Sequence, residues 1–440
     1  MTIFAPATAA GRAGIAVVRI SGPEAGAALA ALAGAIPRAR HAALRRLVDP
    51  ASGAALDDAL VLWFPAPASY TGEDVTELHV HGGRAVTSAV LAALAALPGL
   101  RPAEPGEFTR RAFDNGRLDL TAVEGLADLV GAETEAQRRQ ALRQLDGALG
   151  RLYDGWRETL VGVLARAEAA IDFPEEGLPP GLAEATYRNI EAVYKGITQH
   201  LEDDRRGERL REGAFVAIVG APNVGKSSLL NRLARRDAAI VSHVAGTTRD
   251  VIEVHMDLGG LPAIVADTAG LGESADEIES EGVRRALARA AHADLKLAVF
   301  DASRWPETDA RTRAVVDADT LVVVNKTDLN PVAPDETLDE RPVWPLSCKS
   351  GEGIAALLAG LEAEVARRLV PGGAPALTRE RHRRSLEDCA AALGRARAAR
   401  APELAAEDLR LAVRALGRIT GRVDVEDLLD VIFAEFCIGK

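Results

Sequence analysis

The segment GAPNVGKS at 220–227 constrains the fold of this chain more than any other feature. It follows an apolar run, leads into a helical pattern and matches the phosphate-binding loop, whose backbone N–H groups and helix N-terminus surround phosphates. A chance match in a glycine-rich loop would stand alone, whereas further nucleotide motifs follow here in order. The strands predicted around them are near-continuous apolar runs, as in a parallel sheet covered on both faces: AFVAIVG, LPAIVAD, LKLAVFD, TLVVVNK and RPVWPLS, with VIEVHMDL as an antiparallel edge strand.

Three motifs supply groups for a magnesium ion and for the terminal phosphates. In the phosphate loop, Lys226 would reach the β- and γ-phosphates and the Ser227 hydroxyl would ligate Mg²⁺. The motif GTTRD offers Thr248 to complete the Mg²⁺ coordination in the triphosphate state. In DTAG, which ends a predicted strand, Asp267 would hold the Mg²⁺ shell through water and the Gly270 amide would contact the γ-phosphate.

The motif NKTD at 325–328 selects the base. The Asp328 carboxylate can accept hydrogen bonds from both N1–H and the 2-amino group of guanine, whereas adenine offers neither donor there. Rejection of that kind reaches roughly 10⁴-fold. The motif SCK would supply a backbone donor to the guanine carbonyl, so the predicted ligand is GTP or GDP. Its predicted contacts are Asn223, Val224, Gly225, Lys226, Ser227, Ser228, Thr247, Thr248, Asp267, Thr268, Ala269, Gly270, Asn325, Lys326, Asp328, Ser347, Cys348 and Lys349.

The residue after DTAG is unusual for an enzyme that hydrolyses GTP. Many small GTPases have a glutamine there to orient the attacking water, but this chain has Leu271, which can neither donate nor accept a hydrogen bond. Another group must therefore orient the water and neutralise charge. The acidic stretch ESADEIESEG at 273–282 supplies candidate carboxylates, although any single one of them more commonly caps a helix or faces solvent.

The remaining chain divides by its periodicity. Runs closed by Gly or Pro predict strands at 14–22 and 57–65, and alternation predicts another at 74–83 before a helix at 84–97. Residues 1–118 thus form a small α/β domain. Helical patterns follow at 119–212 and 371–440, with apolar stripes at Tyr187, Ile190, Tyr194, Ile197 and Leu201, and at Leu409, Val413, Leu416 and Ile419.

Each apolar stripe needs a partner, so we predict that the two helical segments pack as one bundle. The fold class is then multidomain α/β plus all-α, with an N-terminal α/β domain, a discontinuous helical bundle and a Ras-like G domain at 213–370 inserted into it.

Composition narrows the partners. The net charge is −12, whereas a chain that grips nucleic acid mainly through phosphates is usually basic. The cysteines Cys348, Cys389 and Cys437 have no paired short spacing, which excludes a zinc knuckle. The start lacks a signal pattern and no apolar run approaches ~20 residues. We expect a cytoplasmic protein without a membrane or DNA partner.

Several segments outside the nucleotide motifs resemble the MnmE (TrmE) family of tRNA-modification GTPases. They are GRAGIAVVRISG, LWFPAPASYTGEDVTELHVHGG, RPAEPGEFTRRAFDNGRLDL, AAIDFPEE and the terminal FCIGK. The resemblance implies a homodimer made by a folate-binding N-terminal domain. It also implies a flavoprotein partner, MnmG, in a heterotetramer that modifies C5 of the wobble uridine (position 34) of certain tRNAs.

The resemblance fills the gap left by Leu271. It implies that a potassium ion takes the place of an arginine finger, and that Glu279, twelve residues after Asp267, positions the attacking water through a second water. The implied potassium ligands are Asn223, Ser242, Val244 and Thr247.

The resemblance also implies a site for 5-formyl- or 5,10-methylene-tetrahydrofolate. Its residues would be Arg19, Glu77, Arg117 and Lys440. Arg117 stands where the family is expected to have lysine, and the two cations differ in geometry. Without the resemblance, Arg19 at a strand end could equally be a surface charge.

Other features keep two interpretations. Cys437 could attack uridine C6, or pack the last helix as a small apolar residue. His79 and His81 share a strand face, but two histidines without a third ligand are more often structural. The stretch TRERHRR at 378–384 is an RNA patch or, more commonly, a solvated helix start. Two other functions stay open: a ribosome-assembly or translation GTPase, and a folate-dependent one-carbon transferase with a regulatory G domain.

Overall fold

The computed structural model describes residues 1–173, 182–235, 239–240, 253–267, 293–369, 375–423 and, near the end, 429–430, 432–433, 436 and 439. Their contacts group the chain into two compact units. One comprises Met1–Ala127, Gln144–Val193 and Asp388–Lys440, and the other Asp128–Arg143 and Tyr194–Glu387. None of the described helices is long and apolar enough to cross a membrane.

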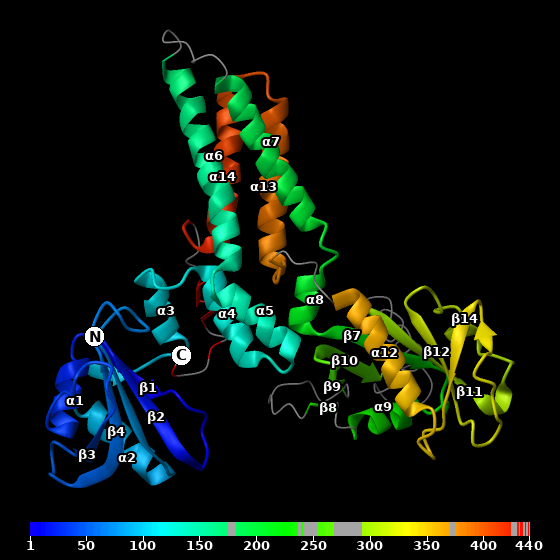
Figure 1. Ribbon diagram of the computed structural model, residues 1–440, viewed down its shortest axis with the longest axis horizontal. Coiled ribbons are helices and arrows are strands. Elements are labelled where there is room, and N and C mark those ends of the chain that lie inside the picture. Colours follow the sequence, from blue (N-terminus) through cyan, green and yellow to red (C-terminus); the bar gives the residue numbers. More distant parts are fainter. Residues whose placement is uncertain are drawn as a thin grey trace, which may run out of the picture. The chain divides into compact units, whose positions relative to one another are not determined.

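A six-stranded sheet organises the N-terminal domain (blue in Figure 1), in the order β3-β4-β5-β2-β1-β6. The strands predicted at 14–22, 57–65 and 74–83 and the helix at 84–97 are confirmed as β2, β4, β5 and α2. The domain consists of β1 (Thr2–Pro6), β2 (Ala13–Ser21), α1 (Ala25–Ala33), β3 (Ala43–Val48), β4 (Ala55–Phe64), β5 (Val75–Gly82), α2 (Arg84–Ala95), β6 (Leu100–Pro102) and α3 (Glu107–Asp114).

Alternation along β2 decides which side chains enter the core of this domain. Ala16, Val18 and Ile20 are buried in a cluster with residues of α1 and α2. Because successive side chains of a strand point to opposite faces, Arg19 lies on the other face of the sheet. There Arg19 pairs across the strands with Glu77 of β5. The sheet register therefore brings together two charges that are far apart in the sequence.

Helices that are distant in the sequence pack side by side in the first unit (Figure 1). Arg410 of α14 (Pro402–Thr420) pairs with Glu168 of α6 (Ala148–Asp172) at 2.9 Å. Arg397 pairs with Glu191 at 2.6 Å, which joins α13 (Glu380–Ala398) to α7 (Leu182–Leu201). The other helices outside the nucleotide domain are α4 (Leu120–Gly131), α5 (Glu135–Leu145) and α8 (Arg206–Glu212).

The predicted apolar stripes are only partly correct. Ile190, Ile197, Leu409, Leu416 and Ile419 are buried. Tyr187, however, is 52% exposed, whereas Val193 of the same helix, which the predicted stripe omitted, is buried.

The second unit contains an eight-stranded sheet in the order β13-β14-β12-β11-β7-β10-β9-β8. All five predicted core strands are present and run parallel, and β9 is antiparallel as predicted. It is not the edge strand, however, because β8 pairs with its outer side. The elements are β7 (Ala214–Gly220), α9 (Lys226–Ala234), β8 (Ala239–Ile240), β9 (Glu253–Leu258), β10 (Leu261–Asp267), β11 (Leu295–Asp301), η1 (Ala302–Arg304), α11 (Ala310–Arg313), β12 (Thr320–Asn325), β13 (Thr337–Leu338), β14 (Arg341–Pro345) and α12 (Ile354–Leu369).

Apolar clusters cover both faces of this sheet. One joins alternate residues of the strands, such as Val216 and Ile218, to Leu229 of α9 and Leu361 of α12. The other contains the intervening residues, such as Val219. The strands are apolar along almost their whole length because the side chains on both of their faces are buried, as the sequence pattern predicted.

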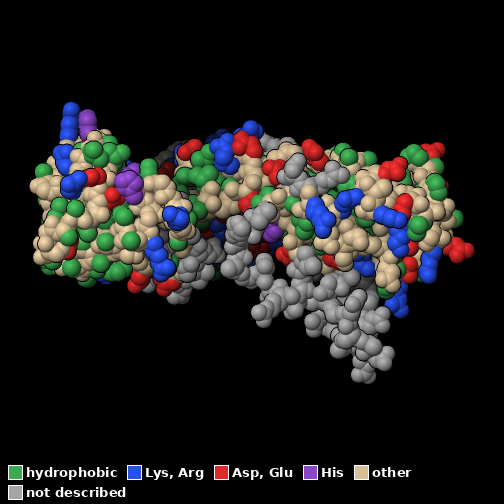
Figure 2. Space-filling model, turned by 90° about the horizontal axis from the view of Figure 1, so that it is seen from below, with side chains coloured by type: hydrophobic (Ala, Val, Ile, Leu, Met, Phe, Trp, Pro, Cys, Tyr) green, Lys and Arg blue, Asp and Glu red, His purple; other side chains and the backbone are tan. Residues whose placement is uncertain are grey.

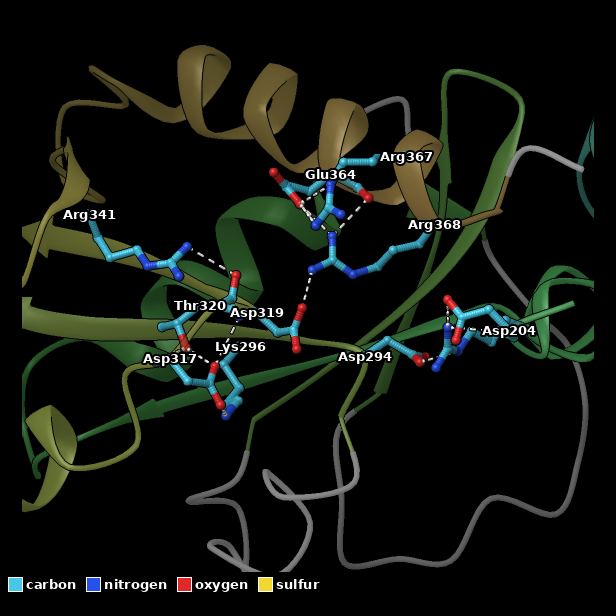
Figure 3. A network of polar contacts seen from close by, with 12 residues as sticks. Asp204, Asp294, Lys296, Asp317, Asp319, Thr320, Arg341, Glu364, Arg367 and Arg368 are labelled. Atoms are coloured by element: carbon cyan, nitrogen blue, oxygen red, sulfur yellow. Dashed lines mark hydrogen bonds and ion pairs between the residues drawn. The ribbon is translucent and has the colours of Figure 1, made fainter. Parts of the chain in front are cut away.

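Charged side chains gather at the amino-terminal edge of this sheet (Figure 3). Lys296, near the start of β11, donates to Asp317, and Arg368 of α12 pairs with Asp319 and Glu364. Lys296 and Arg368 are each 8% exposed, so the carboxylates neutralise two largely buried positive charges. Lys296, Asp317 and Asp319 lie at the amino ends of β11 and β12, whereas the nucleotide motifs lie at the carboxyl ends of the strands.

The stretch TRERHRR contains the start of helix α13, as one of the two interpretations predicted, but this start is only partly solvated, since Glu380 and Arg384 are exposed. His382 is fully buried, and Arg383 pairs with Asp203 at 2.7 Å and with Glu208 at 3.1 Å. Arg379 pairs with Asp128 at 2.8 Å. These side chains hold α13 against α8 and the end of α4, so their charges serve packing within this unit.

Candidate active site

The phosphate loop joins β7 to α9 and is shaped by residues with left-handed backbones. Asn223 has φ 61° and Gly225 φ 100°. A Cβ atom on Gly225 would lie 2.2 Å from Nδ2 of Asn325, so only glycine fits at this position. The loop therefore requires glycine for a close approach to the base-recognition motif as well as for its own turn.

Lys226 is folded back over the loop that it follows. Its Nζ donates to the carbonyl oxygens of Gly220 and Ala221, each at 3.0 Å, and the residue is 8% exposed. Burial lowers the pKa of the Lys226 ammonium, and the negative charge of Asp267 acts in the opposite direction. The ammonium is therefore held at the phosphate loop by carbonyl oxygens that phosphate oxygens could replace.

Ser227 and Asp267 meet although they belong to different motifs. The Ser227 hydroxyl donates to Oδ2 of Asp267 at 2.6 Å, because α9 begins beside the end of β10. A hydroxyl and a carboxylate are hard oxygen donors, which Mg²⁺ prefers. The two residues fit the predicted arrangement, in which the hydroxyl ligates the ion and the carboxylate acts through water.

The base-recognition residues form a connected network at the ends of β12 and β14. Asn325 donates through Nδ2 to the Val224 carbonyl at 2.8 Å and accepts from the Cys348 amide at 3.1 Å. The Ser347 hydroxyl donates to Oδ1 of Asp328 at 2.7 Å. The Asp328 carboxylate keeps a quarter of its side chain exposed, so it can still accept from a base.

The remaining predicted contacts differ in exposure. Lys349 is 85% exposed, with Nζ 4.0 Å from Asp328. Ser228 and Asn223 are exposed as well. Burial raises the pKa of the Cys348 thiol to about 11, so this cysteine is a neutral thiol that contributes its backbone amide.

Asp301 lies beside this network, although none of the sequence motifs includes it. The predicted contact residue Lys326 donates at 2.7 Å to Oδ2 of Asp301 and, at the same distance, to the Asn223 carbonyl. Asp301 ends β11, the strand next to β12. The available signal was a charged residue directly after a buried run, at the carboxyl edge where ligands of parallel sheets bind.

Several predicted positions lie outside the described residues. They are Ser242, Val244, Thr247, Thr248, Thr268, Ala269, Gly270, Glu279, Cys437 and Lys440.

A second cluster surrounds Arg19 in the N-terminal domain. Its guanidinium pairs with Glu77 at 2.9 Å, and each side chain is 19% exposed. It lies over the rings of Tyr70, at 5.2 Å, and Phe108, at 5.8 Å, and its Nη1 is 3.5 Å from the Gly439 carbonyl. The Arg19 guanidinium is therefore largely buried, and it also contacts the Gly439 carbonyl near the C-terminus.

Arg117 is less tightly held than the other two described members of the proposed folate site. It is exposed, and a Cβ on Gly72 would lie 3.4 Å from its Cγ. Because Gly72 is two residues after Tyr70, the segment that covers Arg19 also passes beside Arg117.

The histidine pair has a structural explanation. His79 lies 3.4 Å from Glu77, and His81 bonds to Asp57 through Nδ1 at 2.8 Å. Within the part of the chain that the structure describes, no group of three or more His, Cys, Asp or Glu residues could hold a metal ion.

Comparison with known proteins identifies the family. The MnmE helical domain model matches residues 120–437, and the model of the GTP-binding protein TrmE N-terminus matches 2–117. The chain belongs to the MnmE family. The tRNA modification GTPase MnmE of Rhodospirillum rubrum is 60% identical over 452 residues, covering all of this chain and 99% of that protein. The protein of the same name in Paramagnetospirillum magneticum is also 60% identical, with coverage of 100% and 99%.

A human protein whose name places it in mitochondria is also similar to this chain. The 5-taurinomethyluridine-[tRNA] synthase subunit GTPB3 of Homo sapiens is 52% identical, covering all of this chain and 93% of that protein. Among solved structures, the FeoB G-domain from Methanococcus jannaschii is 24% identical, with a TM-score of 0.27, and the match covers 34% of this chain and 97% of that one. Family membership and the nucleotide network together establish the chain as a GTP hydrolase.

Proposed function

We propose that this chain is a potassium-stimulated GTPase that, together with the flavoprotein MnmG, adds an aminomethyl or carboxymethylaminomethyl group to C5 of the wobble uridine of certain tRNAs. The carbon comes from a tetrahydrofolate derivative. The names of its full-length relatives support tRNA modification. The observation that carries the folate assignment is the Arg19–Glu77 pair, covered by two aromatic rings and reached by the Gly439 carbonyl.

The Arg19 cluster suits a folate by its chemistry. The pterin ring of a folate is flat and carries several hydrogen-bond donors and acceptors, which match a carboxylate, a guanidinium and aromatic faces. Arg117 and Lys440 would complete the site. Arg19 would position the ligand and Glu77 would accept from it, while the enclosing rings exclude water.

The N-terminal domain also offers a surface for the proposed homodimer. Leu44 on the edge strand β3 is 66% exposed and lies directly opposite Leu60 of β4, which is 45% exposed. Adjoining exposed apolar side chains of this kind can contribute to an interface with a second copy. We therefore place the contact with a second copy on this domain.

The charge distribution favours a partner that carries much of the affinity for tRNA. In Figure 2, basic and acidic side chains are interspersed on the face in view. With a net charge of −12, the chain is suited to bind tRNA together with MnmG. The proposed domains are 1–118 for folate and dimerisation, 119–212 and 371–440 for the helical bundle, and 213–370 for the inserted G domain.

The folate role is tested in a reconstituted reaction. With MnmG, tRNA, GTP and 5,10-methylene-tetrahydrofolate, the chain is expected to yield modified wobble uridine, measured by mass spectrometry of tRNA nucleosides. Arg19→Gln should reduce the product at least roughly tenfold, since hydrogen bonds to charged groups contribute on that scale. Its GTP hydrolysis should stay at the parent rate.

The matched control is Arg84→Gln, an exposed arginine at the start of α2 in the same domain. It should retain both activities. Full modification by the Arg19 variant would remove the folate site from this cluster. GTP hydrolysis without any tRNA product from the parent would favour a ribosome-assembly or translation GTPase instead.

Potassium dependence is a separate prediction. GTP turnover in matched potassium and sodium buffers is expected to be at least roughly tenfold faster with potassium, because a cation at Asn223 would replace an arginine finger. Glu279→Ala should abolish turnover in both salts if that carboxylate orients the attacking water. The neighbouring Glu277→Ala should leave it unchanged. Equal rates of the parent protein in the two salts would refute the mechanism and direct attention to an arginine supplied by a partner.

A further inference from the structure

Asp301 occupies a position at the nucleotide site that none of the nucleotide motifs includes. It is the last residue of β11, and the sheet register places it directly opposite Asn325, the last residue of β12. The carboxyl ends of parallel strands meet at one edge of the sheet, where nucleotides bind. Asp301 therefore stands beside the base-recognition motif without belonging to it.

The Lys326 ammonium is held between Asp301 and the phosphate loop. Nζ donates to Oδ2 of Asp301 and to the carbonyl oxygen of Asn223, both at 2.7 Å. Lys326 has φ 70° and Asn223 φ 61°, in the left-handed region that residues with a Cβ rarely occupy. One ammonium group thus fastens two unfavourable backbone positions to each other, one in NKTD and one in the phosphate loop.

The carboxylate of Asp301 is itself fixed. Its Oδ1 accepts from the Ser303 amide at 2.9 Å and from the Ser303 hydroxyl at 2.8 Å, which caps the short helix η1. Burial acts to raise the pKa of Asp301, but hydrogen bonds from Lys326 and Ser303 outweigh it and hold the pKa below its usual value. The side chain is 17% exposed, so solvent screens this ion pair only partly.

We propose that Asp301 is a positioning residue for guanine-nucleotide binding, acting through Lys326. It holds the Lys326 ammonium against the Asn223 carbonyl, so that the base-recognition motif and the phosphate loop keep one relative arrangement. Without the carboxylate, Lys326 loses one of its two acceptors and both loops gain freedom. Binding must then restrict that freedom, which weakens affinity even though Asp301 need not touch the nucleotide.

The test is the affinity of Asp301→Asn for a fluorescent GDP analogue, measured by titration. The dissociation constant is expected to rise roughly ten- to a hundredfold, the range for a lost charge-assisted hydrogen bond. The kcat at saturating GTP should stay near the parent value while KM rises, because Asp301 is not placed at the reacting phosphate. Asp335→Asn, an exposed aspartate of the same unit, is the matched control and should bind GDP like the parent.

A double-mutant cycle separates positioning from a general structural role. Lys326→Met should weaken GDP binding as well, and Asp301→Asn added to it should cause little further loss, since the partner is already gone. Additive losses, or parent affinity in either single variant, would overturn the proposal. Because Lys326→Met is informative by itself, the test does not depend on the Asp301 variant folding.

Discussion

Asp328→Asn is expected to weaken GDP binding by at least roughly a hundredfold, the scale on which a site built to bond a polar group discriminates. The carboxylate can accept from two donors on guanine, whereas an asparagine amide presents one acceptor and one donor. The Ser347 hydroxyl already fixes one carboxylate oxygen at 2.7 Å, so the remaining geometry cannot adjust freely. The same variant should gain affinity for xanthine nucleotides, whose carbonyl replaces the 2-amino group and can accept from the new amide.

The measurement is a pair of titrations with labelled GDP and xanthosine diphosphate. Asp335→Asn serves as the control, because this aspartate is exposed and lies in the same unit. An Asp328 variant that keeps parent affinity for GDP would show that the base is recognised elsewhere. An equal loss for both nucleotides would point to damage of the loop instead of a change in specificity.

Lys226→Met is expected to lower the rate of GTP hydrolysis by roughly a thousandfold, in the range of charged groups that stabilise a transferring phosphoryl group. The ammonium is held at the loop by the Gly220 and Ala221 carbonyls. Burial depresses the pKa of Lys226 in the folded state, so folding disfavours the charged form. A methionine of similar length should therefore leave the melting temperature unchanged or higher while activity is lost.

Steady-state GTP turnover and thermal unfolding, measured on the same preparations, separate these effects. Lys195→Met, at an exposed position of α7, is the control and should match the parent in both. Turnover by the Lys226 variant within a few-fold of the parent, at saturating GTP, would refute a role of the ammonium in catalysis. A large fall in melting temperature would instead indicate that the charge stabilises the loop.

Much of the nucleotide site could be predicted because its motifs are local. Lys226 and Ser227 belong to the phosphate loop itself, and Asp328 is the last residue of NKTD. Hydrogen-bond chemistry then assigns the base without reference to the fold. The direct contact between Ser227 and Asp267, by contrast, depends on the parallel pairing of β7 with β10.

Other contacts depend on pairings that no local pattern contains. Asp301 was missed because its partner Lys326 belongs to a different strand end, and the pairing requires the register between β11 and β12. Arg19 was ambiguous from the sequence, since a strand-end arginine can face solvent. Its contact with Glu77 requires the pairing of β2 with β5.

The sequence by itself determined the class of nucleotide, the strands and helices with strong periodicity, and the family, because these rest on side-chain chemistry and short-range spacing. Only the tertiary structure decided which charges are buried. Arg383 is buried and pairs with Asp203 and Glu208, although the pattern suggested a solvated helix start. The structure also showed that β8, and not β9, forms the edge of the sheet. The physical reason is that burial and ion pairing depend on which distant segments pack together, and a local period of three or four residues carries no information about that choice.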